Sequence, residues 1–159
     1  MVDYLKEKTW DVVSDRRIQS LHPAIKSKVK EFIIRAEKEL GIKLRVVSAF
    51  RNFAEQAKLY EKGRVTKGNI VTNAKAGESM HNYGLAIDVV EIKNGKAIWE
   101  NPRWDAIANL GKSIGFNWGG DWRTIKDKPH FEMTFGHNKN ELLTKYHLGE
   151  RDGEYVHLT

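Results

Sequence analysis

The spacing of hydrophobic residues predicts a long amphipathic helix early in the chain. Between Ile25 and Leu40 apolar side chains recur every three or four residues, and Gly41 follows the last of them. This spacing places the apolar side chains on one face of a helix, and glycine is common just after a helix ends. Similar patterns predict shorter helices over residues 53–60, 102–114 and 138–146.

Strand and loop patterns occupy the segments between these helices. Residues 44–48 and 85–90 are short apolar runs rich in β-branched side chains, which predicts two strands. An Asn-Gly pair at 94–95 is typical of a hairpin turn. Residues 63–80 are polar and predict a long loop that forms one wall of a cleft. The polar tail after residue 146 is expected to be peripheral.

Asp88 interrupts the apolar run at 85–90, where a carboxylate is out of place. Burying a carboxylate is unfavourable unless it meets a cation, a metal or hydrogen-bond donors. Alternation along the strand turns Asp88 away from the neighbours that build the core, toward a cleft. His81 lies seven residues upstream, and Gly84 lets the chain between them fold back. A buried salt bridge from Asp88 to Arg51 is the plainer alternative.

A second polar-apolar alternation supplies another candidate. Phe131, Met133 and Phe135 alternate as the core face of a predicted strand, which leaves His130 on the other face. If this strand pairs with the strand that carries Asp88, the imidazole and the carboxylate lie close together. The two strands would then present their polar side chains to the same cleft.

Two histidines and one carboxylate with an open fourth position are typical ligands of catalytic zinc. We therefore predict a Zn²⁺ site on His81, Asp88 and His130. Asp127 lies three residues before His130, and the chain before Pro129 is biased to extended geometry. Polyproline geometry repeats every three residues, so Asp127 is expected beside the metal without being a ligand. Taken alone, Asp127 could equally be an exposed loop carboxylate.

Two ordered motifs carry a resemblance to a known family. They are Ser-x-His-x-x-Gly-x-Ala-x-Asp at 79–88 and Asp-x-Pro-His-Phe at 127–131, and they follow Ser-Ala-Phe-Arg at 48–51, Gln56, Leu-Tyr at 59–60 and Gly-Arg at 63–64. This set resembles the zinc D-alanyl-D-alanine carboxypeptidase family. Within that family it is most similar to the L-alanyl-D-glutamate peptidases that phages, as endolysins, and bacteria use on peptidoglycan. Each motif alone is weak, but the ordered combination is specific.

The resemblance implies an α+β fold of the Hedgehog-like type, with a small antiparallel sheet and flanking helices. It implies a zinc metallopeptidase that hydrolyses the peptidoglycan stem peptide at the L-Ala–D-Glu bond and so degrades the cell wall. In the family pattern Asp127 is the general base, and Arg51 steadies the oxyanion or a substrate carboxylate. The first alternative is a D-Ala-D-Ala carboxypeptidase. The second is a zinc-containing Hedgehog-like binding module without turnover.

Four further residues have weaker assignments. Gln56, Ser79 and Trp118 are candidate substrate contacts, although Trp118 could instead pack in the core or at the cleft rim. Glu132 has the right face of its strand to orient a ligand imidazole. A solvated strand glutamate is an equal alternative for Glu132.

Composition limits the remaining possibilities. With 159 residues we expect one catalytic domain over 1–159, without a separate wall-binding module, acting as a monomer. The chain has no cysteine, so any metal must be held by histidines and carboxylates. Its net charge of +6 is expected to attract an anionic cell-envelope surface. Nucleic acid is not an expected partner, because the basic residues are interspersed with acidic ones.

The hydropathy of the chain bears on where it would act. No segment is long and apolar enough for a transmembrane helix, and the first residues lack the apolar stretch of a signal peptide. We therefore expect synthesis in the cytoplasm. A cell-wall enzyme made in this way must be released by another route, and the resemblance suggests phage-type lysis.

Overall fold

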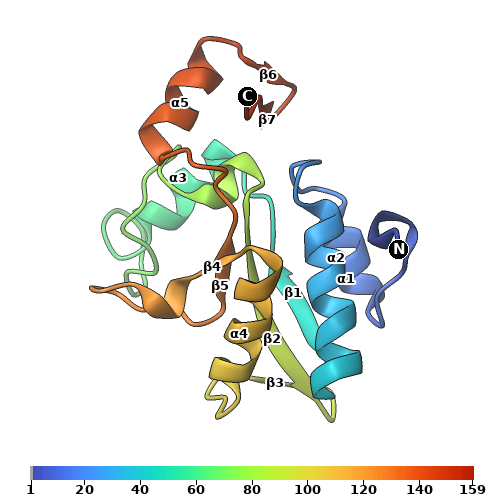
Figure 1. The fold of residues 1–159 in the computed structure, drawn as a ribbon. Coiled ribbons are helices and arrows are strands. Elements are labelled where there is room, and N and C mark those ends of the chain that lie inside the picture. The colour runs from blue at the N-terminus through green and yellow to red at the C-terminus, as the bar shows by residue number, and fades with distance from the viewer. Residues whose placement is uncertain (1) are drawn as a thin grey trace.

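The computed structural model describes residues 2–159 as a small sheet with helices packed on one face (Figure 1). None of the helices within this range combines the length and apolar character needed to cross a membrane. Short 3₁₀ or π turns are labelled η. In chain order the elements are η1 (Tyr4–Lys6), α1 (Val12–Ile18), α2 (Lys26–Arg35), η2 (Ala36–Leu40), β1 (Leu44–Ser48), α3 (Phe53–Glu61), η3 (Met80–Tyr83), β2 (Ala86–Lys93), β3 (Lys96–Ile98), α4 (Trp104–Ile114), β4 (Asn117–Trp118), η4 (Gly119–Asp121), β5 (His130–Glu132), α5 (Lys139–His147), β6 (Arg151–Asp152) and β7 (Tyr155–Val156).

The predicted helices are all present, and their ends have local causes. The long helix comprises α2 and η2, and it ends at Gly41, whose φ of 65° continues the chain in the left-handed region. Helices α3 and α5 each begin with a capping box, formed by Asn52 with Glu55 and by Asn138 with Glu141. These reciprocal side-chain bonds satisfy backbone N–H groups that a helix start leaves unpaired.

The main sheet is antiparallel, which confirms the expected α+β class. Its strand order is β1-β2-β5-β4, and β3 pairs with the far end of β2. The β2–β3 hairpin turns at Asn94 and Gly95, with φ values of 52° and 75°. Positive φ at both central residues is the requirement of a type I′ turn, which explains the predictive value of the Asn-Gly pair.

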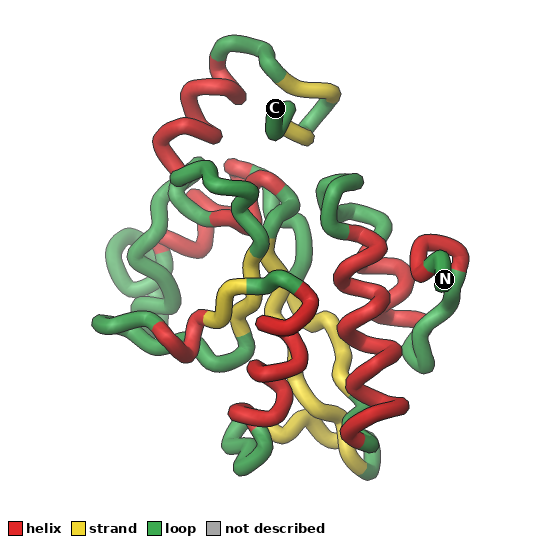
Figure 2. Tube along the Cα trace, in the orientation of Figure 1, coloured by secondary structure: helices red, strands yellow, loops and turns green. Residues whose placement is uncertain are grey.

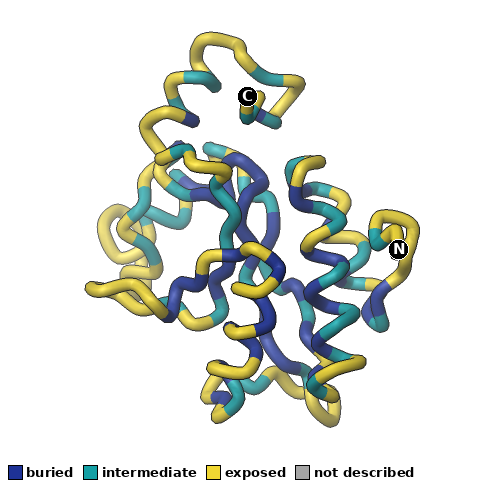
Figure 3. The backbone as a smooth tube through the Cα atoms, viewed as in Figure 1, coloured by how far each residue is buried: buried dark blue, intermediate teal, exposed yellow. Residues whose placement is uncertain are grey.

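The hydrophobic core lies between the sheet and helices α2 and α4 (Figure 3). The ring of Phe32 on α2 lies 5.0 Å from that of Phe131 on β5. Gly111 on α4 lets the helix approach, since an added Cβ would lie 2.8 Å from the Phe131 ring. Phe131 is paired with Ile87 across β5 and β2, so both residues face these helices. The polar side chains at the alternate positions of β2 and β5 therefore lie on the opposite face of the sheet.

The prediction that Phe135 belongs to the core was wrong. Strand β5 ends at Glu132, and Phe135 is 45% exposed with a φ of 52°. Glu132 is paired with the first residue of β2, and the N–H of Met133 bonds to Leu85 just before that strand. In the part of the chain that the structure describes, no strand pairs with the residues beyond Met133, so the chain turns away and the alternation ends.

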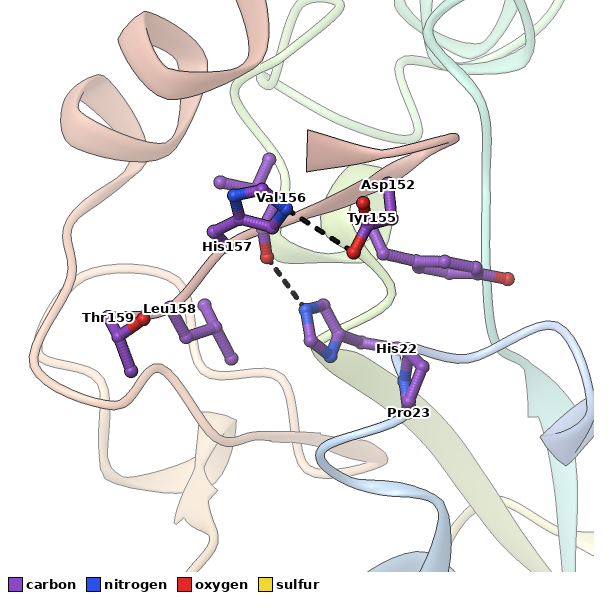
Figure 4. Close-up of a pocket in the computed structure, with 8 residues that line it drawn as sticks. All are labelled: His22, Pro23, Asp152, Tyr155, Val156, His157, Leu158 and Thr159. Atoms are coloured by element: carbon purple, nitrogen blue, oxygen red, sulfur yellow. Dashed lines mark hydrogen bonds and ion pairs between the residues drawn. The ribbon is translucent and has the colours of Figure 1, made fainter. Parts of the chain in front are cut away.

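The C-terminal tail is more integrated than its polarity predicted. Strands β6 and β7 form a small hairpin beside α5, and Val156 in that hairpin is 1% exposed. The imidazole of His22 donates from Nε2 to the carbonyl of Val156 at 2.8 Å (Figure 4). The hydroxyl of Tyr155 donates to the carbonyl of Ser20 at 2.7 Å. These bonds fasten the end of the chain to the segment before α2.

The long loop predicted after α3 is present. Residues 62–79 hold no helix or extended strand, only an isolated bridge between Lys62 and Thr66. Figure 2 shows this segment as a green loop beside α3. It leads directly into η3, the turn that carries His81.

Candidate metal centre

Asp88 and His130 lie side by side on adjacent strands of the sheet. They are direct partners in the pairing of β2 with β5, on the face opposite Ile87 and Phe131. Oδ1 of Asp88 lies 3.3 Å from Nδ1 of His130, and Oδ2 lies 3.4 Å from Nε2 of His81. The predicted strand pairing is therefore present, and the three proposed ligands meet at one point.

His81 is positioned by the short turn η3. Its N–H donates to the hydroxyl of Ser79 at 3.2 Å, and Ser79 also forms a capping box with Asn82. The turn ends at Gly84, which has a φ of 68°. A Cβ on Gly84 would lie 2.5 Å from the backbone nitrogen of His22, so only glycine fits both the conformation and the space. Ser79 thus supports the turn that presents His81.

The same turn is bonded to the segment that follows β1. The N–H of Arg51 donates to the carbonyl of His81 at 3.0 Å, and the side-chain amide of Asn82 donates to the carbonyl of Arg51 at 2.8 Å. Nδ1 of His81 donates to the carbonyl of Ala49 at 2.7 Å. These bonds fix the orientation of the His81 ring and place Arg51 next to it.

The donor set fits a metal ion. One nitrogen of each imidazole already has an outer partner, because His81 bonds to Ala49 through Nδ1 and His130 lies 2.7 Å from Oε1 of Glu132 through Nε2. The other nitrogens face Asp88, and three ligand atoms of this cluster lie within 4.8 Å of one another. Outer partners of this kind fix the tautomer and orientation of ligating histidines.

The electrostatics of the cluster favour a positive charge at its centre. Burial opposes ionisation of Asp88, but hydrogen bonds from His130 and His81 outweigh it and hold the pKa of this carboxyl below its usual range. Burial also lowers the pKa of His130, yet bonding to Asp88 and Glu132 outweighs it and raises that pKa to about 9. Asp88 is therefore ionised and His130 holds a proton beside it, and a cation bound there would take the place of that proton.

Asp127 lies in the turn before His130, next to the cluster. Its N–H donates to the carbonyl of Gly119 at 3.0 Å, and its carbonyl accepts from the N–H of His130 at 3.2 Å. A Cβ on Gly119 would lie 2.3 Å from the Asp127 carbonyl oxygen, so this close approach requires glycine. Burial, and then the charge of Asp88, raise the pKa of Asp127. Its carboxylate makes no hydrogen bond within residues 2–159 and is available to a ligand.

The two tryptophans near the site differ in position. Trp118 is 8% exposed, and its indole N–H donates to the carbonyl of Lys128 at 2.7 Å. This places Trp118 under the turn that carries Asp127, where it supports the turn rather than facing outward. Trp122 is 39% exposed, and its ring centre lies 4.9 Å from that of His130. Trp122 is therefore the aromatic side chain at the open rim.

Arg51 is held by its own neighbours and makes no ion pair with Asp88. Its Nη1 donates to Oε1 of Gln56 at 2.9 Å, and its Nη2 donates to the hydroxyl of Ser48 at 3.1 Å. Gln56 is fully buried, and its Nε2 donates to the carbonyl of Ala74 at 2.8 Å. The structure thus favours a positioning role for Gln56 over direct contact with a substrate.

Some components of the site had no assignment from the sequence. The Ala49 carbonyl is a backbone group, and no residue type announces its bond to His81. Asn82 lies inside the predicted motif, and its amide accepts from the N–H groups of Gly77 and Ser79 while donating to Arg51. A buried asparagine between two motif residues was the available signal.

Comparison with known proteins adds independent information. Residues 72–133 match a family model described as D-alanyl-D-alanine carboxypeptidase. The chain is 43% identical over 123 residues to the peptidoglycan L-alanyl-D-glutamate endopeptidase CwlK of Bacillus subtilis, covering 71% of this chain and 73% of that protein. It is 35% identical over 69 residues to the L-alanyl-D-glutamate peptidase of Listeria phage A118, covering 40% of this chain and 25% of that protein. Among solved structures, the L-Ala D-Glu endopeptidase ChiX of Serratia marcescens aligns with a TM-score of 0.61 and 25% identity, over 85% of this chain and 96% of that one.

Proposed function

This chain belongs to the D-alanyl-D-alanine carboxypeptidase family of peptidases, and we propose that it hydrolyses the L-Ala–D-Glu bond of the peptidoglycan stem peptide. The choice of bond follows the relatives of similar length, CwlK and ChiX, which are named for it. Their aligned regions extend over most of this chain. The family membership and the cluster of His81, Asp88 and His130 support the same class of reaction.

The observation that carries the proposal is the complete His-Asp-His cluster with outer partners on both imidazoles. Such a set with an open remaining position suits Zn²⁺ in a catalytic site. When bound there, zinc would polarise the scissile carbonyl and lower the pKa of a water molecule toward neutrality. His81, Asp88 and His130 would hold the metal, while Glu132 and the Ala49 carbonyl hold the imidazoles.

Two further side chains are proposed to act on the substrate. Asp127 would accept the proton of the attacking water and deliver it to the leaving amine, because its carboxylate is unbonded and lies beside the cluster. Arg51 would donate to the oxygen that becomes negative as the carbonyl is attacked. Its Ser48 and Gln56 bonds use only part of the five N–H donors of a guanidinium, so others remain for the substrate.

Two alternatives remain distinguishable by assay. A D-Ala-D-Ala carboxypeptidase needs a pocket for the free terminal carboxylate, with a cation in addition to the one that steadies the oxyanion. A binding module would keep the metal and lack turnover. Incubating purified peptidoglycan with wild-type protein and with His130→Ala separates the last case. We expect soluble peptides to be released by the wild type alone, and the absence of release by both would overturn the proposed activity.

The setting of the reaction is also proposed. Residues 1–159 would act as one catalytic domain and a monomer on the cell wall. The net charge of +6 would favour contact with anionic polymers of a cell envelope, an attraction that salt screens. The Listeria phage relative fits release during phage-type lysis, after synthesis in the cytoplasm.

A further inference from the structure

The Gly-Arg pair at 63–64 has no part in the chemistry described above. It follows α3 and begins the long loop that returns to η3 at residue 79. A charged residue in an exposed loop is ordinarily solvated. Arg64 is exposed too, but its guanidinium donates three hydrogen bonds, one to the end of α3 and two to residues 72–73 of the loop.

Arg64 connects the end of α3 to residues 72–73, in the part of the loop that returns toward η3. Its Nη1 donates to the carbonyl of Tyr60 at 2.7 Å and to that of Thr72 at 3.0 Å, and its Nη2 donates to Oδ1 of Asn73 at 2.9 Å. The guanidinium carbon lies 3.9 Å from the centre of the Tyr60 ring. Within residues 2–159 it has no acidic partner. Arg64 therefore fastens residues 72–73 to the end of α3.

Gly63 allows the start of the loop to lie close to its returning part at Ile70. Its φ is 81°, and an added Cβ would lie 2.7 Å from the backbone nitrogen of Ile70. Its N–H donates to the carbonyl of Thr66 at 3.0 Å. Gly63 thus lets the returning part of the loop come close to the end of α3, and the guanidinium of Arg64 holds residues 72–73 there.

The loop segment that Arg64 holds is connected to Arg51 through the buried side-chain amide of Gln56. Ala74 directly follows the residues that Arg64 holds, and its carbonyl accepts from Nε2 of Gln56 at 2.8 Å. The other end of the same amide, Oε1, accepts from Nη1 of Arg51 at 2.9 Å. Gln56 is fully buried, so a displaced Ala74 carbonyl would leave its N–H group without a partner. The position of residues 72–74 and the orientation of Arg51 are therefore coupled.

We propose that Arg64 is a positioning residue that fixes the orientation of Arg51 through Asn73, Ala74 and Gln56. The inference rests on the proposed function, since it assigns Arg64 a purpose in the reaction that Arg51 assists. Arg64 would not touch the substrate. Its effect would appear in turnover, because a misplaced guanidinium stabilises the developing charge less well while the metal ligands stay in place.

The test compares Arg64→Ala with Lys67→Ala. Lys67 is an exposed residue of the same loop, and its side chain makes no hydrogen bond or ion pair within residues 2–159. We expect Arg64→Ala to keep its zinc content and to lower kcat about 10- to 100-fold, with KM changed much less. Arg64→Lys should recover only part of this loss, since an ammonium lacks the planar fork. Lys67→Ala should retain wild-type kcat.

A double-mutant cycle tests the route. In an Arg51→Ala background the further change Arg64→Ala should cost almost nothing, because the group it positions is already absent. An equal loss in both backgrounds, or a kcat for Arg64→Ala equal to that of Lys67→Ala, would overturn the inference. Either of these two results would overturn the role of Arg64 while the wild type still cuts the L-Ala–D-Glu bond. Failure of the wild type to cut that bond would instead overturn the proposed function on which the inference rests.

Discussion

Oε1 of Glu132 lies 2.7 Å from Nε2 of His130, on the side of the ring away from Asp88. The two residues are separated by one position on β5, so their side chains project from the same face of the sheet. The carboxylate accepts a hydrogen bond from Nε2–H of His130, which leaves Nδ1 directed at the cluster. Strand alternation thus supplies both the third ligand and the group that orients it.

We predict that Glu132→Gln lowers zinc affinity about 10- to 100-fold without removing a ligand. The neutral amide is a weaker acceptor and would hold the His130 tautomer less firmly. Competition with a chelator measures the affinity. An unchanged affinity would mean that Glu132 is only a strand glutamate beside the site.

The metal assignment predicts the loss of zinc from three single variants. His81→Ala, Asp88→Ala and His130→Ala each remove one of three protein ligands, so each should contain little zinc after purification and dialysis. Elemental analysis gives the content. His147→Ala is the control, because this histidine is exposed and its side chain makes no hydrogen bond within residues 2–159, and it should keep the wild-type content. Full zinc in all three variants would refute the ligand set.

Asp127→Asn should separate the base from the ligands. The variant is expected to keep zinc and to lose about 10²- to 10⁴-fold in kcat, the usual contribution of a general base. Zinc content and turnover must be measured on the same preparation. Loss of zinc would make Asp127 a ligand and would move the general base to another group.

A remote carboxylate predicts how stability depends on pH. Burial opposes ionisation of Asp11, but hydrogen bonds from Arg45 and Ser14 outweigh it, and the pKa lies below the ordinary value of 3.8. The unfolded chain therefore binds this proton at higher pH than the folded chain, so the stabilisation is present above about pH 4 and is lost as pH falls through the folded pKa.

Accordingly, Asp11→Asn should destabilise the protein by about 1–3 kcal/mol near neutral pH, and the difference from wild type should shrink below about pH 4. Urea unfolding of the metal-free proteins at several pH values measures it. Asp152→Asn is the control, because that side chain is 91% exposed and should show little effect at any pH. A difference that persists unchanged at low pH would show that the charge of Asp11 is not responsible.

Much of this architecture could be predicted because its causes are local. The periodicity of α2, the Asn94-Gly95 turn and the alternation around Asp88 and His130 each reflect short-range geometry that residue types encode. The position of Phe135 could not be predicted in this way. Alternation extends along the sequence past Glu132, but the partner strand ends there, and only the sheet pairing reveals it.

The supporting bonds of the site were beyond sequence reasoning for a related reason. The Ala49 carbonyl and the Gln56 amide act through contacts between segments that are distant in sequence. The C-terminal hairpin is similar, since Val156 is buried by its contact with the segment at His22 and not by any apolar pattern of its own. Polarity of a segment indicates its average surroundings and does not exclude one anchored residue.

The bond that is cut tests the account most directly. Purified peptidoglycan should be digested with the zinc-loaded wild type, and the muropeptides should be analysed by mass spectrometry. We predict new peptides that begin with an amino-terminal D-Glu, and muramic acid fragments that retain only L-Ala. Release of free D-Ala without any new D-Glu terminus would contradict the account and would identify a carboxypeptidase instead.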